Sequence, residues 1–169
     1  MPTVRLIPID VALSDTLRAG AFERRTGATL PDPDVVQHLV DQTLVRLPDA
    51  RAPWCAYLAV DADSAQVVAT CAFKSAPSEG AVEIAYWTFE PFEGRGYAKA
   101  MAAALVAVAS EAPEVATVVA HTLPEPNASP RVLTATGFTF AGDVIDPEDG
   151  PVWRWTRPLR DGGYVSSAA

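Results

Sequence analysis

The sequence is poor in the residues that build metal centres and disulfide frameworks. It has two cysteines, Cys55 and Cys71, and two histidines, His38 and His121, none of them grouped in sequence. Without a Cys/His cluster at ligand spacing, no metal site is predicted. Two isolated cysteines are typical of small buried side chains in a reducing compartment, so no disulfide is expected either.

Positive charge and long apolar runs are also scarce. The chain has 13 Lys and Arg against 21 Asp and Glu, a net charge of −8. An acidic chain without a basic stripe binds phosphate backbones poorly, which argues against a nucleic-acid partner. No apolar run reaches the ~20 residues of a membrane span, and the opening MPTVRLIPID lacks a signal-peptide pattern. We therefore expect a cytoplasmic protein with no membrane partner.

Hydrophobic residues make up 49% of the 169 residues, enough for one domain with a sizeable core. We predict a single domain over residues 1–160 and a disordered tail over residues 161–169, which are rich in Gly, Ser and Ala. Strands are expected at residues 4–7, 54–60, 66–73, 82–89, 114–123, 138–145 and 152–156. Helices are expected at residues 11–19 (continuing irregularly to 25), 33–47, 97–109 and 130–136. This order predicts a mixed α/β fold, a central sheet flanked by helices.

Residues 81–109, AVEIAYWTFEPFEGRGYAKAMAAALVAVA, organise the rest of the chain. A β-branched and aromatic strand leads into a turn with Gly94 and Gly96, and an Ala-rich helical pattern begins at Tyr97. Such a turn directs the free N–H groups and the positive dipole end of the helix towards one point. The segment therefore predicts a phosphate-binding site.

Four motifs, in this order, carry a resemblance to a known family: VEIAYW, EGRGYA, LPEPNASPRVL followed by GF, and DPEDGPVWRW. Over roughly residues 4–158 the chain resembles the GNAT acetyltransferases, in particular the branch that includes ribosomal-protein N-terminal acetyltransferases. The resemblance implies a GNAT-like central mixed sheet. Its fourth and fifth strands would splay apart, and the pantetheine arm of acetyl-CoA would enter between them.

The resemblance also implies a set of cofactor contacts. The backbone amides of the glycine turn would hold the pyrophosphate, the end of the fourth strand would pair with the pantetheine amides, and the loop after the fifth strand would contact the CoA arm. The residues so implied are Thr88, Phe89, Gly94, Arg95, Gly96, Tyr97, Ala98 and Asn127. Glu93 departs from the family pattern, which has Gln or Arg there. We therefore expect the backbone amides alone to hold the pyrophosphate at this position.

Acetyl transfer to an amine needs an acceptor for the amine proton and a donor for the departing thiolate. Glu83 interrupts an otherwise apolar strand just before the glycine turn, and we predict it as the base, with His121 on the next strand as the alternative. Many GNAT enzymes place a tyrosine acid at the position of Leu133, so Ser129 is the remaining candidate donor. An alternative role for Ser129 is the N-cap of the following helix.

The sequence thus predicts an acetyl-CoA-dependent N-acetyltransferase acting on a primary amine, either a protein N-terminus or a small molecule. An alternative is a non-catalytic acyl-CoA sensor of the same fold, suggested by the departures at Glu93 and Leu133. A dinucleotide-binding domain is disfavoured because its Gly-x-Gly-x-x-Gly pattern is missing near the N-terminus. The sequence leaves the oligomeric state open between monomer and homodimer.

Overall fold

The computed structural model describes residues 1–160, so the predicted tail, 161–169, lies outside the described residues. Seven strands form one sheet: β1 (Val4–Pro8), β2 (Ala56–Asp61), β3 (Val67–Phe73), β4 (Ala81–Thr88), β5 (Thr117–Thr122), β6 (Thr139–Asp146) and β7 (Gly150–Pro158). The helices are α1 (Val11–Arg18), α2 (Phe22–Thr26), α3 (Pro33–Arg46), α4 (Tyr97–Ser110) and α5 (Ala128–Ala135), with a short 3₁₀ turn, η1 (Glu90–Phe92). None of the helices within residues 1–160 is long and apolar enough to cross a membrane.

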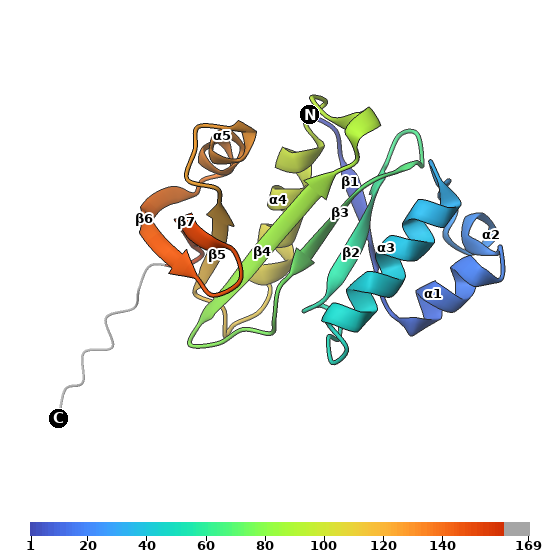
Figure 1. The fold of residues 1–169 in the computed structure, drawn as a ribbon, viewed down its shortest axis with the longest axis horizontal. Helices are drawn as coiled ribbons and strands as arrows, with labels where there is room; N and C mark the ends of the chain where they lie inside the picture. Colours follow the sequence, from blue (N-terminus) through green and yellow to red (C-terminus); the bar gives the residue numbers. More distant parts are fainter. Residues whose placement is uncertain (161–169) are drawn as a thin grey trace.

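The predicted mixed α/β fold class is confirmed. The strand order is β1-β2-β3-β4-β5-β7-β6, and β4 with β5 is the parallel pair while the other neighbours run antiparallel. A parallel pair requires a crossover, which α4 supplies. In Figure 1, α4 passes behind β4, whereas α1 and α3 lie in front of the β1–β3 part of the sheet.

The core lies mainly between the sheet and α4. This helix is apolar nearly all round, and one side of it is buried against β1, β3 and β4. Its buried side chains are Tyr97, Ala100, Met101, Ala102, Leu105, Val106 and Ala109. Small alanines allow the helix to approach the sheet closely, so α4 is held rigidly relative to β4.

Two expected helices differ from the structure. The irregular continuation expected after α1 is a separate short helix, α2, because the chain turns at Gly20 with a φ of +62°. The helix expected at residues 130–136 begins earlier, at Ala128. The remaining predicted elements agree with the structure within about three residues at each end.

The C-terminal hairpin packs its two indoles on one face, since they are two residues apart on strand β7. Trp153 and Trp155 both contact Phe140 edge-on, with ring centroids 5.8 and 5.6 Å apart. The Trp155 indole also donates a hydrogen bond to the Thr122 hydroxyl of β5. These contacts fix the β6–β7 hairpin against β5, at the opposite end of the sheet from α1 and α3 (Figure 1).

Candidate active site

The site is organised by the gap between β4 and β5. The two strands pair from Ala81 with Thr117 to Ile84 with Ala120, and there the pairing stops, although β4 continues to Thr88. The predicted splay of the fourth and fifth strands is therefore present in the structure. Beyond Ile84, no strand within residues 1–160 pairs with the edge of β4 that faces β5.

The alternation of β4 decides which of its main-chain groups point into this gap. The carbonyl of Glu83 accepts from Lys74 and the amide of Phe89 donates to Val68, so odd-numbered residues bond towards β3. The amides and carbonyls of Tyr86 and Thr88 consequently face the gap. The main chain of Thr88 faces the gap, as the predicted pantetheine contact there requires. The Phe89 amide is bonded to Val68 on the opposite edge, so a contact at Phe89 could not use this amide.

The two candidate bases are hydrogen-bonded to each other. His121 Nδ1 lies 2.8 Å from Glu83 Oε1, and Lys74 Nζ lies 3.2 Å from the same oxygen. An ionised carboxylate only accepts, so Nδ1 carries the hydrogen and, in the neutral ring, Nε2 is left as a proton acceptor. Glu83 is therefore a partly buried carboxylate held between a lysine and an imidazole.

The glycine turn prepares the start of α4 for an anion. Gly94 and Gly96 both have left-handed backbones, with φ of +72° and +90°, and no side chain caps the helix. By contrast, Asp10, Asp32 and Asn127 each accept a backbone N–H at the starts of α1, α3 and α5. The first-turn N–H groups of α4 lack the side-chain partner that those of α1, α3 and α5 have, as also in the short helix α2. Free N–H groups at the glycine turn are what a phosphate site requires.

The side chains around this turn take different directions. Arg95 is exposed, with its guanidinium 5.6 Å from the centre of the Phe92 ring, and Tyr97 is buried with its ring against the same phenylalanine. A Cβ placed on Gly96 would lie 3.1 Å from Pro2 Cδ, because the N-terminus runs beside the turn (Figure 1). Glycine at position 96 is therefore required by its φ and by Pro2.

Asn127 and Ser129 lie at the start of α5. Asn127 is the N-cap, since its Oδ1 accepts from the Ser129 amide at 3.0 Å. The alternative reading of Ser129 as the N-cap is wrong, because the helix begins two residues earlier than expected and Ser129 falls inside its first turn. The Ser129 hydroxyl is thus not used for capping.

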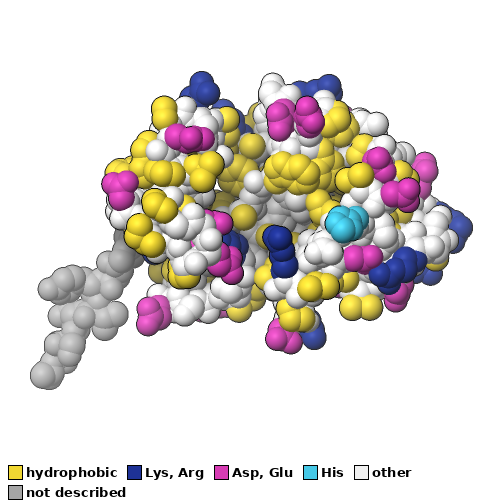
Figure 2. All heavy atoms as spheres, in the orientation of Figure 1, with side chains coloured by type: hydrophobic (Ala, Val, Ile, Leu, Met, Phe, Trp, Pro, Cys, Tyr) yellow, Lys and Arg dark blue, Asp and Glu magenta, His cyan; other side chains and the backbone are white. Residues whose placement is uncertain are grey.

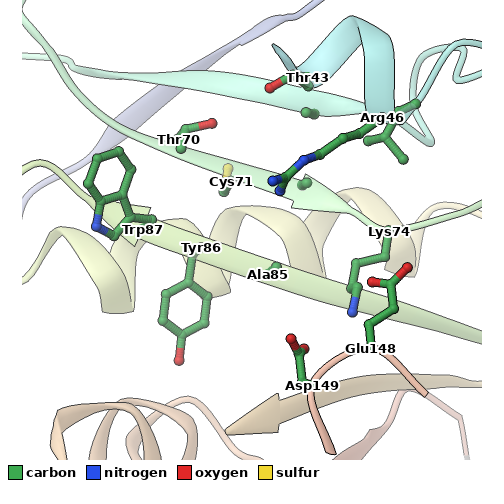
Figure 3. Close-up of a pocket in the computed structure, with 13 residues that line it drawn as sticks. Thr43, Arg46, Thr70, Cys71, Lys74, Ala85, Tyr86, Trp87, Glu148 and Asp149 are labelled. Carbon is green, nitrogen blue, oxygen red and sulfur yellow. The ribbon is translucent and has the colours of Figure 1, made fainter. Parts of the chain in front are cut away.

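A cavity of about 750 Å³ opens next to the gap, on the face of the sheet that bears α3. Its walls come from α3, β2, β3, β4 and the β6–β7 turn. Figure 2 shows the surface of the molecule hollowed at its centre. In Figure 3 the guanidinium of Arg46 points into the cavity, and the Lys74 ammonium points towards Glu148 and Asp149. The Glu83–His121 pair borders this cavity through Lys74, which lines it.

Sequence reasoning missed Tyr86 as a site residue. Its ring lines the cavity, and its hydroxyl is buried without a hydrogen-bond partner in residues 1–160. Burial raises the pKa of Tyr86 to about 12, and the nearby Ser129 hydroxyl opposes the rise in part. A tyrosine in a strand usually indicates packing. The clue in the sequence was that Tyr86 is two residues from both Ile84 and Thr88. Residues at this spacing direct their main-chain groups to the same edge of a strand, here the open one.

A splayed parallel pair, an uncapped helix start and a carboxylate–imidazole pair define a site for transferring a group carried by a phosphate-containing cofactor. The chain belongs to the GNAT acetyltransferase family, since the model of the acetyltransferase (GNAT) domain matches residues 13–139. The predicted class of activity, acetyl-CoA-dependent N-acetyl transfer, is confirmed by this membership. The comparisons give no support to the alternative of a non-catalytic sensor.

Solved structures share the fold at low sequence identity. An acetyltransferase from Salmonella typhimurium that modifies the N-terminal serine of ribosomal protein L7/L12 is 18% identical, with a TM-score of 0.65 over 94% of this chain and 96% of that one. The L7/L12 acetyltransferase RimL in complex with CoA is 19% identical (TM-score 0.64, 92% and 94% covered). An aminoglycoside acetyltransferase, AAC(6')-Ib, in complex with CoA is 20% identical (TM-score 0.60, 94% and 95% covered). No curated protein sequence matches the chain.

Proposed function

We propose that acetyl-CoA lies in the gap between β4 and β5 and that a primary amine reaches its thioester from the neighbouring cavity. The observation that carries this proposal is the placement of the Glu83–His121 pair, 2.8 Å apart, at the point where the two strands separate. Any thioester held in the gap has proton-accepting groups beside it. The cavity gives an amine access from the opposite side.

The cofactor would be held largely by main-chain groups. The amides at the start of α4 would bind the pyrophosphate, and the free edge of β4 at Thr88 would pair with the pantetheine arm. Arg95 is exposed beside the turn and would add positive charge, whereas Glu93 is acidic. The proposed cofactor-binding residues are Thr88, Gly94, Arg95, Gly96, Tyr97, Ala98 and Asn127.

Acetyl transfer would form one bond, break one bond and move one proton. The amine nitrogen forms a bond to the acetyl carbon, the carbon–sulfur bond breaks, and its electron pair remains on sulfur. The proton lost by nitrogen passes to Glu83, directly or through a water molecule. His121 Nε2 is the alternative acceptor, with Glu83 then holding its other nitrogen. We propose that the Ser129 hydroxyl donates to the departing thiolate, since it is free of the capping role.

Two acidic side chains, Glu148 and Asp149, and two basic ones, Arg46 and Lys74, line the cavity, so it is the acidic end that would favour a cationic amine. Glu148 and Asp149, in the β6–β7 turn, stand at one end of the cavity, and the chain as a whole is acidic. Structures with the same fold act on amines of several kinds: a protein N-terminus, an aminoglycoside and spermidine. A peptide N-terminus and a small-molecule amine both fit this description.

We also propose a cytoplasmic location and a monomeric or homodimeric state. Support for the location comes from Cys55 and Cys71, which are both buried and free, as expected in a reducing compartment. Burial raises the pKa of the Cys71 thiol to about 12, which makes it unreactive.

The test is a thermal melt with acetyl-CoA, followed by an acceptor screen that scores CoA release. Acetyl-CoA at ~100 times its dissociation constant should stabilise the protein by roughly 2.7 kcal/mol, while NAD and ATP should not. Gly96→Val should abolish this shift, because valine tolerates neither the φ of +90° nor the contact with Pro2. A wild-type protein whose melting temperature ignores acetyl-CoA would contradict the cofactor assignment.

A further inference from the structure

The Tyr86 hydroxyl stands out among the buried polar groups of this protein. Within residues 1–160 it is the one buried side-chain oxygen or nitrogen that lacks a hydrogen-bond partner. Leaving such a group unsatisfied is destabilising, and native structures contain few of them. A partner that arrives with a ligand would explain why the hydroxyl is kept.

Three observations place this hydroxyl at the gap in which the thioester is proposed to lie. Tyr86 lies beyond Ile84, on the part of β4 that has separated from β5. Tyr86 is one of the residues that line the cavity, and the side chain of Ser129 on α5 lies close to its hydroxyl. In Figure 3 the phenol ring points away from Arg46 and the α3 wall, towards α5 and the C-terminal strands.

We propose that the Tyr86 hydroxyl donates a hydrogen bond to the sulfur of acetyl-CoA and stabilises the thiolate that forms when the carbon–sulfur bond breaks. This inference depends on the proposed function, in which the thioester occupies the gap. In the position where other GNAT enzymes carry a tyrosine, this chain has Leu133, which is fully buried. Leu133 lies on α5, and a tyrosine from a different element, strand β4, brings its hydroxyl close to Ser129 on the same helix.

The chemistry of the phenol sets the form of its contribution. A phenol that resists ionisation keeps its proton at neutral pH, so Tyr86 acts as a hydrogen-bond donor and the CoA leaves as a thiolate. The amine proton still goes to the Glu83–His121 pair. The developing negative charge on sulfur is what strengthens the hydrogen bond in the transition state, which is the requirement for a catalytic effect.

The decisive comparison is between Tyr86→Phe and Tyr57→Phe. Tyr57 is also buried, but its hydroxyl donates to the Pro53 carbonyl at 2.7 Å. Tyr86→Phe should lower kcat by roughly 10- to 100-fold, leave the dissociation constant of acetyl-CoA near normal, and keep or raise Tm. Tyr57→Phe should lower Tm by roughly 2–4 °C and leave kcat unchanged.

A binding measurement tests the sulfur contact without turnover. At about pH 9, where much of the free thiol is ionised, wild-type protein should bind CoA more tightly than desulfo-CoA. In Tyr86→Phe this preference should shrink about tenfold, while desulfo-CoA binds as it does to the wild type. Tyr57→Phe should keep the full preference.

The outcomes separate this inference from the proposed function. If wild-type protein binds neither acetyl-CoA nor CoA, the proposed function itself fails. If wild-type protein binds and turns over acetyl-CoA, but Tyr86→Phe keeps both kcat and the preference for CoA over desulfo-CoA, only the role of Tyr86 is overturned. A Tyr86→Phe protein with reduced kcat, lower Tm and an unchanged CoA preference would also overturn it, because it would show a structural role.

Discussion

The two halves of the β4–β5 pair differ in almost every property that matters for function. From Ala81 to Ile84 the strands are hydrogen-bonded to each other, and Val82, Ile84 and Val118 are buried under α4. From Tyr86 onwards β4 has no partner on that side, and the gap collects hydroxyls and open main-chain groups.

This contrast teaches where a sheet can hold a site. A paired segment satisfies its own backbone, so its side chains can be entirely apolar and serve the core. An unpaired edge inside the molecule must obtain its hydrogen bonds elsewhere, which is what an extended ligand arm supplies. The Glu83–His121 contact falls at the boundary, where both conditions meet.

Among the changes considered, Glu83→Gln should have the largest effect on kcat. A positioned base contributes about 10²- to 10⁴-fold, so kcat should fall by that order while acetyl-CoA still shifts Tm. The matched control is Glu23→Gln. Glu23 is an exposed carboxylate on α2, outside the proposed site, so this change should leave kcat intact. Steady-state kinetics on a confirmed acceptor gives the answer.

His121→Asn, measured alongside, identifies the proton acceptor. If Glu83 is the base, His121→Asn should lose less activity than Glu83→Gln and keep a pH profile of similar shape. Equal losses, with the acid limb of the pH–rate profile abolished in His121→Asn, would assign the proton to His121. Full activity in Glu83→Gln would refute the assignment of the pair.

Val118→Ala probes the paired half and should have the opposite consequence. Val118 is completely buried opposite Val82, so removing two methyl groups should cost about 2 kcal/mol of unfolding free energy. In a chain of this length that corresponds to a fall in Tm of roughly 4–8 °C. Turnover per folded molecule should stay the same, as judged by kcat well below the new Tm. A large loss of kcat would show that the two halves are coupled.

A smaller effect concerns alkaline stability. Burial raises the pKa of Tyr86 from 10.0 to about 12, so the folded state holds a proton that the unfolded state releases above pH 10. Stability should therefore fall as pH rises from 10 to 12, and at pH 11 this one group should cost about 1.4 kcal/mol. Urea unfolding at pH 8 and pH 11 should show a smaller alkaline loss in Tyr86→Phe than in wild type. Equal losses would mean that Tyr86 ionises normally.

Much of the fold was predictable because its signals are local. The period of the helices and the alternation of the strands depend on neighbours in sequence, and the predicted starts at residues 11 and 33 are those that the structure shows after the caps Asp10 and Asp32. For α5 the sequence offered Ser129 as the N-cap, but the structure has Asn127. Both residue types are good caps, and a Ser-Pro step resembles a helix start.

The sequence by itself determined the glycine turn, the helix it opens and the family, since a φ of +72° or +90° requires the residue type that the chain shows at positions 94 and 96. Only the tertiary structure decided which groups meet. The contact of Glu83 with His121 joins residues 38 positions apart, and it depends on the register of a parallel pair that no local pattern specifies. The exposed edge at Tyr86 depends on where that pairing ends, because pairing is a property of two strands together.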